Sequence, residues 1–300
     1  MSPHGAGPEL LAVGETMAMV APLTGDRLVD AEHFRLDAGG AESNVAAHVA
    51  ALGHRAGWFS RLGDDALGRR VAMQLAGRGV DVSSVVTDPV HPTGLYVKDP
   101  GNGVRYYRAG SAASHLAPAD AERVELGGVR ILHVSGITAA ISESAAGFLS
   151  RLMDRAHEAG VLVSFDVNHR LALWGCAEAA DTLAALARRA DLVFTGRDEA
   201  ESLWGTVSAG DVRALFPDAP ELVVKDGSVG ATTYLGDEEV FEPALVVDVV
   251  DVVGAGDAFA GGYLAALLGG ATPADRLRAG HRRAALTLLT TGDSIDERVL

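Results

Sequence analysis

Cysteine and lysine are scarce in this 300-residue chain, which has one cysteine, Cys176, and two lysines, Lys98 and Lys225. A single cysteine excludes an internal disulfide and any metal site built from several thiolates. A nucleophilic role for Cys176 would need a histidine partner, and no histidine signature accompanies it. The sequence therefore predicts neither a disulfide-stabilised fold nor a cysteine enzyme.

Positive charge is also in short supply. Lys and Arg total 25 against 40 Asp and Glu, a net charge of −15. A nucleic-acid-binding surface needs a basic stripe, so we expect no nucleic-acid partner. The longest run without charge, residues 258–274, is interrupted by glycines and Pro273 and is too short for a membrane span. Residues 1–8 lack the pattern of a signal peptide and are expected to be disordered; we expect a cytoplasmic protein with no membrane partner.

Apolar runs of strand length alternate with longer Ala- and Leu-rich segments of helical period. With 48% hydrophobic residues, the chain can form a large core. The alternation predicts a parallel sheet with helices on both faces, and unbroken apolar runs are typical of strands buried on both sides. The predicted strands are residues 131–134, 161–165, 192–194 and 221–225, and the predicted helices include residues 143–159 and 179–189.

Two segments do not fit the parallel sheet. Residues 16–37 and 93–108 combine polar–apolar alternation with turn signals such as Asp-Pro-Gly-Asn-Gly at 99–103. A hairpin over residues 95–107 is the natural interpretation of the second segment. We therefore predict one domain, residues 9–300, whose core carries a small β lid formed by these two segments.

The segment before Asp257 points to anion chemistry. An apolar stretch at 245–250 leads into Gly254, Ala255 and Gly256, and a helical pattern follows. Small residues at a helix start let backbone N–H groups approach a phosphate closely. An aspartate beside a bound anion is understandable if it takes a proton from a hydroxyl that attacks a phosphoryl group. The alternative interpretation is that Asp257 only caps the helix.

Other phosphate-binding motifs are missing. No Walker loop surrounds either lysine, and no G-x-G-x-x-G fingerprint or G-x-S-x-G elbow occurs. A second glycine pair precedes the first clear helix, at residues 39–40, with Asn44 four residues further on. Paired glycines permit close approach of a ligand, and an asparagine both donates and accepts hydrogen bonds. A tight turn with a helix cap is the alternative.

Three motifs in this order, at residues 39–44, 63–68 and 254–257, resemble those of the ribokinase-like (PfkB) carbohydrate kinases over essentially the whole chain. The resemblance implies a three-layer α/β core with a mostly parallel central sheet and a β-sheet lid. It also implies ATP and Mg²⁺ as cofactors and phosphorylation of a sugar hydroxyl. Val252 and Val253 replace the family's threonines, which leaves a monovalent-cation site open.

Further stretches at 93–96, 106–112, 133–138 and 166–170 look like those of 2-keto-3-deoxygluconate kinases. Such a substrate carries a carboxylate, to which Arg108 and Arg170 could donate bidentate hydrogen bonds. The alternatives are a solvated hairpin arginine for Arg108 and a structural salt bridge for Arg170. We expect the lid tyrosines Tyr96 and Tyr106 to contact sugar hydroxyls.

The resemblance thus implies a complete set of site residues. Glu199 is expected to contact Mg²⁺ through water, with an exposed carboxylate at a helix start as the alternative; the family's Asn-x-x-Glu is Gly-Arg-Asp-Glu here. The loop after Lys225 is expected on the nucleotide side, with an ordinary β-turn as the alternative. The implied catalytic residues are Asp257, Gly254, Ala255 and Gly256; the substrate-binding residues are Gly40, Asn44, Tyr96, Tyr106, Arg108, Arg170, Asp257 and Asp293; the ATP-binding residues are Asn168, Lys225, Gly227, Gly230, Gly254 and Gly256.

The sequence therefore predicts an ATP-dependent kinase for the 6-hydroxyl of 2-dehydro-3-deoxy-D-gluconate. A kinase of the same fold for a neutral sugar or nucleoside is the first alternative, although it would leave two cations unpaired. A non-catalytic sugar-acid-binding protein is the second. Exposed strand edges of the lid favour pairing between subunits, so we expect a homo-oligomer.

Overall fold

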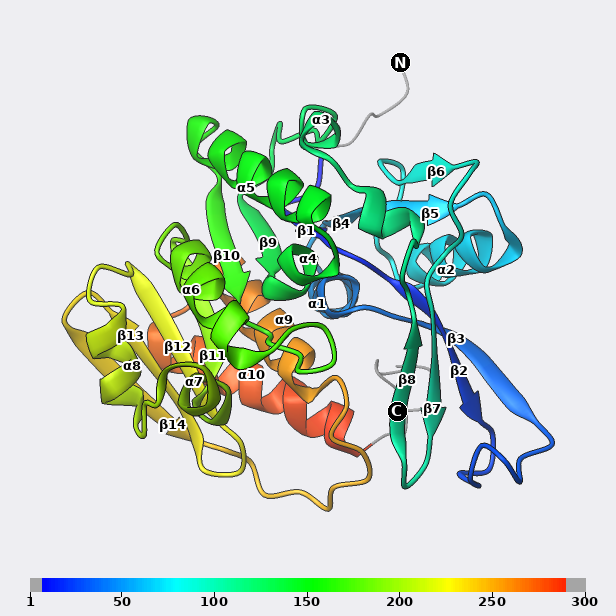
Figure 1. Ribbon diagram of the computed structural model, residues 1–300. Coiled ribbons are helices and arrows are strands. Elements are labelled where there is room, and N and C mark those ends of the chain that lie inside the picture. Colours follow the sequence, from blue (N-terminus) through cyan, green and yellow to red (C-terminus); the bar gives the residue numbers. More distant parts are fainter. Residues whose placement is uncertain (1–6, 290–300) are drawn as a thin grey trace.

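The protein is built around an eight-stranded sheet, seen in a computed structural model that describes residues 7–289 (Figure 1). The strand order is β14-β13-β12-β11-β10-β9-β1-β4; pairing is parallel from β12 to β4 and antiparallel at β12–β13–β14. The strands of this sheet are β1 (Leu10–Val13), β4 (Ala56–Phe59), β9 (Ile131–Ser135), β10 (Leu162–Asp166), β11 (Leu192–Gly196), β12 (Glu221–Asp226), β13 (Gly230–Leu235) and β14 (Glu238–Pro243).

Helices cover both faces of this sheet because successive residues of its strands point to opposite faces and are apolar on both. In β10, for example, Val163 and Phe165 pack on one face, whereas Leu162 packs on the other. One face is covered mainly by α5 (Glu143–Glu158), α6 (Cys176–Ala187), α7 (Arg197–Trp204) and α8 (Ala209–Leu215), with α3 (Pro118–Ala121) and α4 (Gly136–Ile141) at its edge; the other face is covered by α1 (Ala41–Ala51), α2 (Ala66–Gly77), α9 (Ala255–Leu268) and α10 (Pro273–Leu288). The predicted three-layer α/β architecture is confirmed.

A smaller, four-stranded sheet stands beside this core at the right of Figure 1. Its order is β3-β2-β7-β8, from β2 (Met17–Pro22), β3 (Phe34–Gly39), β7 (Leu95–Asp99) and β8 (Gly103–Tyr107). These strands come from the two segments predicted as a lid, and β7 and β8 form the expected hairpin. A short two-stranded sheet pairs β5 (Arg61–Gly63) with β6 (Val86–Asp88), and the 3₁₀ helix η1 (Ala112–His115) follows β8.

Three expectations from the sequence concern the N-terminal residues, Asp293 and the absence of a membrane span. Gly7, placed in the terminus expected to be disordered, has a carbonyl that accepts a hydrogen bond from Arg55 Nε at 3.0 Å; residues 1–6 lie outside the described part. Asp293 also lies outside it. Among residues 7–289, no helix has the length and apolar character needed to cross a membrane.

Candidate active site

The cavity at the carboxyl edge of the large sheet has a volume of about 620 Å³ and is shared with the smaller sheet. In parallel sheets, ligands bind outside the carboxyl ends of the strands, and this volume suits a small-molecule ligand. Among the lining residues, the structure brings together most of those predicted from the sequence: Gly40, Asn44, Tyr96, Tyr106, Arg108, Asn168, Arg170, Glu199, Lys225, Gly254, Gly256 and Asp257.

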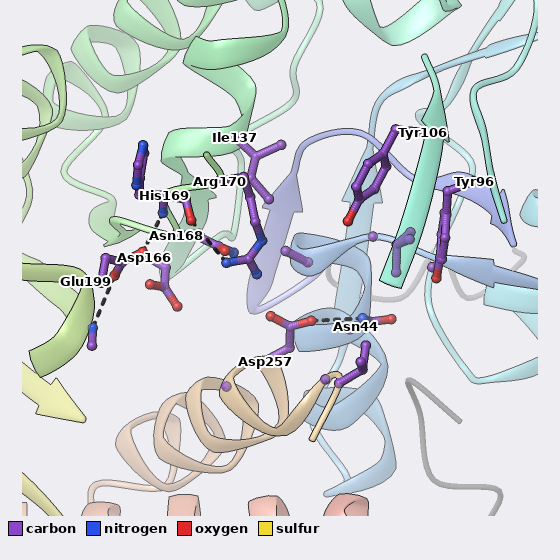
Figure 2. A pocket seen from close by; sticks show the side chains of 18 of the residues that line it. Asn44, Tyr96, Tyr106, Ile137, Asp166, Asn168, His169, Arg170, Glu199 and Asp257 are labelled. Carbon is purple, nitrogen blue, oxygen red and sulfur yellow. Dashed lines mark hydrogen bonds between the residues drawn. The ribbon is translucent and has the colours of Figure 1, made fainter. Parts of the chain in front are cut away.

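Asp257 lies in the first turn of α9 and points toward α1 (Figure 2). Its Oδ2 accepts a hydrogen bond from Asn44 Nδ2 at 2.9 Å, and the coulombic field of Arg170 reaches it. Burial raises the pKa of Asp257 to about 7, although the Asn44 hydrogen bond and Arg170 oppose the rise. A carboxyl group poised near neutrality is suited to general-base catalysis.

The helix cap is Gly254, not Asp257, which disfavours the capping interpretation. Gly254 has φ +82°, a left-handed conformation that glycine adopts without strain, and no side chain caps the helix. Its neighbour Gly256 also lines the cavity, whereas Ala255 does not. The N-terminal end of α9 therefore opens into the cavity, as an anion site requires.

Gly40 is required by close packing. It is the N-cap residue of α1 in an extended conformation, and a Cβ there would lie 2.5 Å from the Glu15 carbonyl oxygen. Asn44, on the same helix, donates its amide to Asp257 and leaves its Oδ1 buried without a hydrogen-bond partner among the described residues. That oxygen could accept a hydrogen bond from a ligand hydroxyl.

Arg108 forms a buried ion pair, which differs from both interpretations of the sequence. Its Nε donates to Glu15 Oε2 at 2.6 Å, and its side chain is 11% exposed. Glu15 Oε1 also accepts a hydrogen bond from Ser111 Oγ at 2.5 Å. The charge of Arg108 is therefore largely balanced within the protein, and Glu15 is a cavity residue that the sequence analysis missed.

Arg170 is the exposed counterpart of Arg108. Within residues 7–289 it forms no ion pair, and its one hydrogen bond there runs from Nη1 to the His169 carbonyl at 3.2 Å. Figure 2 shows its side chain extending into the cavity above Asp257. The structural salt bridge considered for Arg170 is thus absent from the described residues, and its guanidinium faces the ligand space.

The tyrosines of the smaller sheet differ in exposure. Tyr96 of β7 is buried, whereas Tyr106 of β8 is 42% exposed, and their rings lie 5.9 Å apart. The Arg108 guanidinium lies 5.8 Å from the centre of the Tyr106 ring. The three residues therefore form one wall of the cavity.

Three charged residues lie close together at the opposite end. Lys225 Nζ donates to Asp166 Oδ2 at 2.9 Å, and Asp166 Oδ1 is buried without a partner among the described residues. Glu199 accepts hydrogen bonds from the backbone N–H groups of His169 and Gly196 and from the Thr195 hydroxyl. Burial and the nearby Asp166 carboxylate raise the pKa of Glu199. Glu199 is thus a carboxylate at a helix start whose oxygens accept hydrogen bonds from the protein, and it is not fully exposed.

The loop after Lys225 departs from the cavity. Gly227 lies in the turn between β12 and β13, Gly230 is the first residue of β13, and neither is among the lining residues. A Cβ on Gly230 would lie 2.4 Å from the Glu242 carbonyl oxygen, so packing against β14 accounts for that glycine. The ordinary-turn interpretation fits these two positions better than a nucleotide contact does.

Glu15 and Asp166 could have been found from their place in the sequence. Asp166 follows a predicted strand and Glu15 follows the first apolar run, so both lie at strand ends, where ligands bind to a parallel sheet. The pairing partners of these carboxylates, Arg108 and Lys225, are 93 and 59 residues away. No local pattern predicts such contacts.

Comparisons with known proteins identify the family of this chain. The model of the pfkB family of carbohydrate kinases matches residues 8–298. The chain is 37% identical over 294 residues to a 2-dehydro-3-deoxygluconokinase from Bacillus subtilis, covering 95% of this chain and 91% of the relative. It is 33% identical to another from Thermoproteus tenax, covering 95% and 90%. It is 36% identical to fructokinase-1 of Zea mays, covering 86% and 83%.

A solved structure shares both the fold and the topology of the core. The crystal structure of 2-dehydro-3-deoxygluconokinase from Thermotoga maritima superposes with a TM-score of 0.87 at 25% identity, covering 96% of this chain and 95% of that one. The match includes nearly the full length of each protein. The chain therefore belongs to the pfkB family of carbohydrate kinases.

Proposed function

We propose that this kinase transfers the terminal phosphoryl group of ATP to the 6-hydroxyl of 2-dehydro-3-deoxy-D-gluconate. The observation that carries the proposal is Asp257: its pKa is raised to about 7, Asn44 holds it, and it lies at the glycine-rich start of α9. The names of the relatives from Bacillus subtilis and Thermotoga maritima support this substrate.

Asp257 acts as the general base in this proposal. Its ionised carboxyl takes the proton of the 6-hydroxyl as the hydroxyl oxygen attacks the terminal phosphorus. The Asn44 amide fixes the carboxyl through Oδ2. Because Asn44 can only donate through Nδ2, its Oδ1 stays free to orient the sugar.

The start of α9 stabilises the charge that develops on the transferring group. Backbone N–H groups of Gly254, Ala255 and Gly256 lie where the helix dipole is positive. Fixed donors aimed at developing charge contribute strongly because they need no reorganisation during the reaction.

The sugar acid binds between α1 and the smaller sheet. Arg170 contacts the carboxylate, because it forms no ion pair within residues 7–289, while Arg108, which is paired with Glu15, donates to sugar oxygens. Tyr96 and Tyr106 form the wall above the sugar, and Gly40 lets the ligand approach the start of α1. The remaining predicted contact, Asp293, lies outside the described residues.

ATP with Mg²⁺ fits the opposite end of the cavity, where Asn168 and Lys225 lie. Mg²⁺ would supply positive charge there that neutralises the phosphates. Asp166 fits this ion through its unpartnered buried Oδ1, whereas Glu199, engaged by three donors, fits it only through water. Among residues 7–289, no group of three or more His, Cys, Asp or Glu side chains could by itself hold a metal ion.

A monovalent-cation site before Gly254 stays a prediction. Val252 and Val253 offer no side-chain oxygen, and Asp251 pairs with Lys98 at 3.6 Å. A monovalent cation there would rely on backbone carbonyl groups.

A neutral-sugar kinase is the second candidate, because Glu15 already balances the charge of Arg108. The similarity to fructokinase-1 of Zea mays also supports this candidate. Binding without catalysis is the third, and the intact Asp257 and glycine start of α9 disfavour it.

A coupled ADP-release assay tests these candidates. We would compare 2-dehydro-3-deoxy-D-gluconate, its galactonate epimer, fructose and ribose at equal concentrations. The proposal predicts the highest kcat/KM for a sugar acid. Faster turnover of fructose or ribose would favour the neutral-sugar kinase, and no ADP release with any sugar would favour the binding protein.

A further inference from the structure

Lys225 lies at the carboxyl end of β12 with its ammonium group at the cavity. Parallel pairing with β11 sets it opposite Gly196, which places it beside the start of α7. Its side chain is 20% exposed, and Nζ is held 2.9 Å from Asp166 Oδ2. The hydrogen bond fixes the position of the charge.

The same ammonium group lies close to the start of α9. A Cβ built on Gly256 would lie 3.8 Å from Lys225 Nζ. Gly256 belongs to the first turn of α9, where N–H groups and the helix dipole attract anions. Lys225 and the start of α9 therefore border the same small volume, and Asp257 belongs to that first turn too.

The ammonium group of Lys225 donates a hydrogen bond to the carboxylate of Asp166, and the negative charges of Glu199 and Asp257 also act on it. An ammonium group has three N–H donors. The bond to Asp166 uses one, which leaves two for a ligand.

We propose that Lys225 is a catalytic residue, whose ammonium group donates hydrogen bonds to the phosphoryl group as it passes from ATP to the sugar. The inference rests on the proposed kinase reaction. The sugar oxygen forms a bond to the terminal phosphorus, the bond from that phosphorus to the bridging oxygen breaks, and ADP leaves with the electron pair. The hydroxyl proton goes to Asp257, and Lys225 keeps all its protons.

This role has a clear electrostatic reason. In phosphoryl transfer, negative charge is spread over the peripheral oxygens of the moving group. Lysine binds phosphate as a compact point charge. The chain has no Walker loop, yet the fold brings a lysine from a strand far from Gly256 in sequence to the side of the glycine-rich turn.

Lys225→Met tests the kinetic consequence. We expect kcat to fall by about 10²- to 10³-fold, as when one donor to developing charge is removed. The KM for the sugar acid should change by less than about threefold, because the lost contact is not to the sugar. Unchanged kcat would overturn the proposal.

Arg197→Met is the matched control. Arg197 also pairs with a carboxylate next to the end of β12, since its Nε lies 2.8 Å from Asp226 Oδ1, but it does not line the cavity. Its loss should leave kcat within about twofold. A drop equal to that of Lys225→Met would assign the effect to a weakened strand end and overturn the proposal.

A binding measurement separates contact with the phosphoryl group from support of Asp166. Calorimetry would compare Mg²⁺·AMP-PNP with Mg²⁺·ADP on wild type and Lys225→Met. A phosphoryl contact predicts at least about tenfold weaker AMP-PNP binding relative to ADP, since a hydrogen bond to a charged group is lost for only one ligand. Equal weakening of both ligands would show that Lys225 only holds Asp166 in place.

This experiment needs no sugar, so it can succeed even if the proposed substrate is wrong. If Lys225→Met does not fold, Lys225→Gln replaces it, because the glutamine amide can still donate to Asp166. The same selective loss of AMP-PNP is expected for that variant, and its absence would overturn the proposal.

Discussion

At the scale of single residues, Asp257 and Glu199 show how similar positions acquire different chemistry. Each is an acidic residue in the first turn of a helix at the cavity. Glu199 accepts backbone hydrogen bonds from residues 169 and 196, so its carboxyl holds the loop after β10 against the end of β11. Asp257 caps nothing and accepts a single side-chain amide. Only Asp257 therefore retains the freedom that a general base needs.

Asp257→Asn should lower kcat by about 10²- to 10⁴-fold, because the amide cannot take a proton. That loss corresponds to roughly 3–5 kcal/mol of transition-state stabilisation. In the wild type, kcat/KM should fall as the pH drops below about 7, since the base must be ionised and burial has raised its pKa to about 7. Steady-state assays from pH 5 to 9 check both.

Circular dichroism serves as the folding control for this variant. A correctly folded Asp257→Asn protein with kcat close to that of wild type would remove Asp257 from the mechanism. A wild-type profile that is flat between pH 5 and 8 would contradict the pH dependence.

Arg170→Gln should raise the KM for the sugar acid at least about tenfold and leave the KM for fructose nearly unchanged; any loss of kcat through a higher pKa of Asp257 should be the same for both substrates. Loss of a charge-assisted hydrogen bond costs about 1.5–3 kcal/mol. Only the sugar acid has a carboxylate that can accept this bond, so only its binding should weaken. Steady-state kinetics with both substrates provide the measurement. An equal rise in KM for both would argue against a carboxylate contact.

Two further arginine variants serve as comparisons for Arg170→Gln. Arg69→Gln removes an exposed partner of Asp64 outside the cavity and should change neither substrate. Arg108→Ala leaves Glu15 buried without its partner, so we expect it to impair turnover of both substrates through the disturbed cavity wall.

At the scale of elements, α1 and α9 form the pair that aligns Asn44 with Asp257. They touch at Gly261 of α9, where a Cβ would lie 2.5 Å from His48 Cβ and 3.2 Å from the Val45 carbonyl oxygen. The close approach of these helices therefore depends on a glycine. Any separation would lengthen the 2.9 Å hydrogen bond between the two site residues.

Gly261→Ala should destabilise the protein by about 1–3 kcal/mol, because an added methyl group overpacks the contact. It should also lower kcat, since α1 and α9 carry the base and its partner. Urea unfolding and steady-state kinetics measure the two effects. Gly77→Ala, at the exposed end of α2 with open space around its Cβ, is the control and should be neutral or stabilising by up to about 1 kcal/mol. Similar results for both variants would refute the packing argument.

At the scale of the whole molecule, parallel strands gather the site at one edge, while the smaller sheet adds the opposite wall. Lys98 of the smaller sheet reaches Asp251, in the loop that precedes α9, at 3.6 Å. The ion pair links the two parts of the protein across the cavity. Whether the smaller sheet also pairs between subunits, as its free edges β3 and β8 suggest, stays a prediction, as does the cytoplasmic location.

Stability of the whole molecule should reflect the cost of ionising Asp257. Its pKa is about 7 in the folded protein against an ordinary 3.8, so the folded state binds more protons between these values and stability falls as the pH rises through them. Asp257→Asn removes this penalty. Its free energy of unfolding should exceed that of wild type by more at pH 8 than at pH 5.

Urea titrations at the two pH values provide this measurement. Glu238→Gln, which removes an exposed carboxylate on β14, is the control and should show no such pH-dependent gain. A gain for Asp257→Asn that is the same at both pH values would contradict a burial penalty at the base.

The sequence by itself determined the architecture and the identity of the main chemical groups. Buried strands of a parallel sheet need unbroken apolar runs, so strands such as β9 and β12 could be predicted within a residue or two. The glycine-rich start of α9 and Asp257 could be predicted because a helix start and its residues are neighbours along the chain. Features formed by residues that are neighbours along the chain can therefore be predicted from the sequence.

The tertiary structure decided which of these groups remain available to a ligand. Arg108 is paired with Glu15, Gly230 packs against β14, and Lys225 is paired with Asp166. Each outcome depends on a contact between strands or loops that are distant in sequence. Because electrostatic and packing partners are chosen by proximity in space, no motif could assign them before the chain was folded.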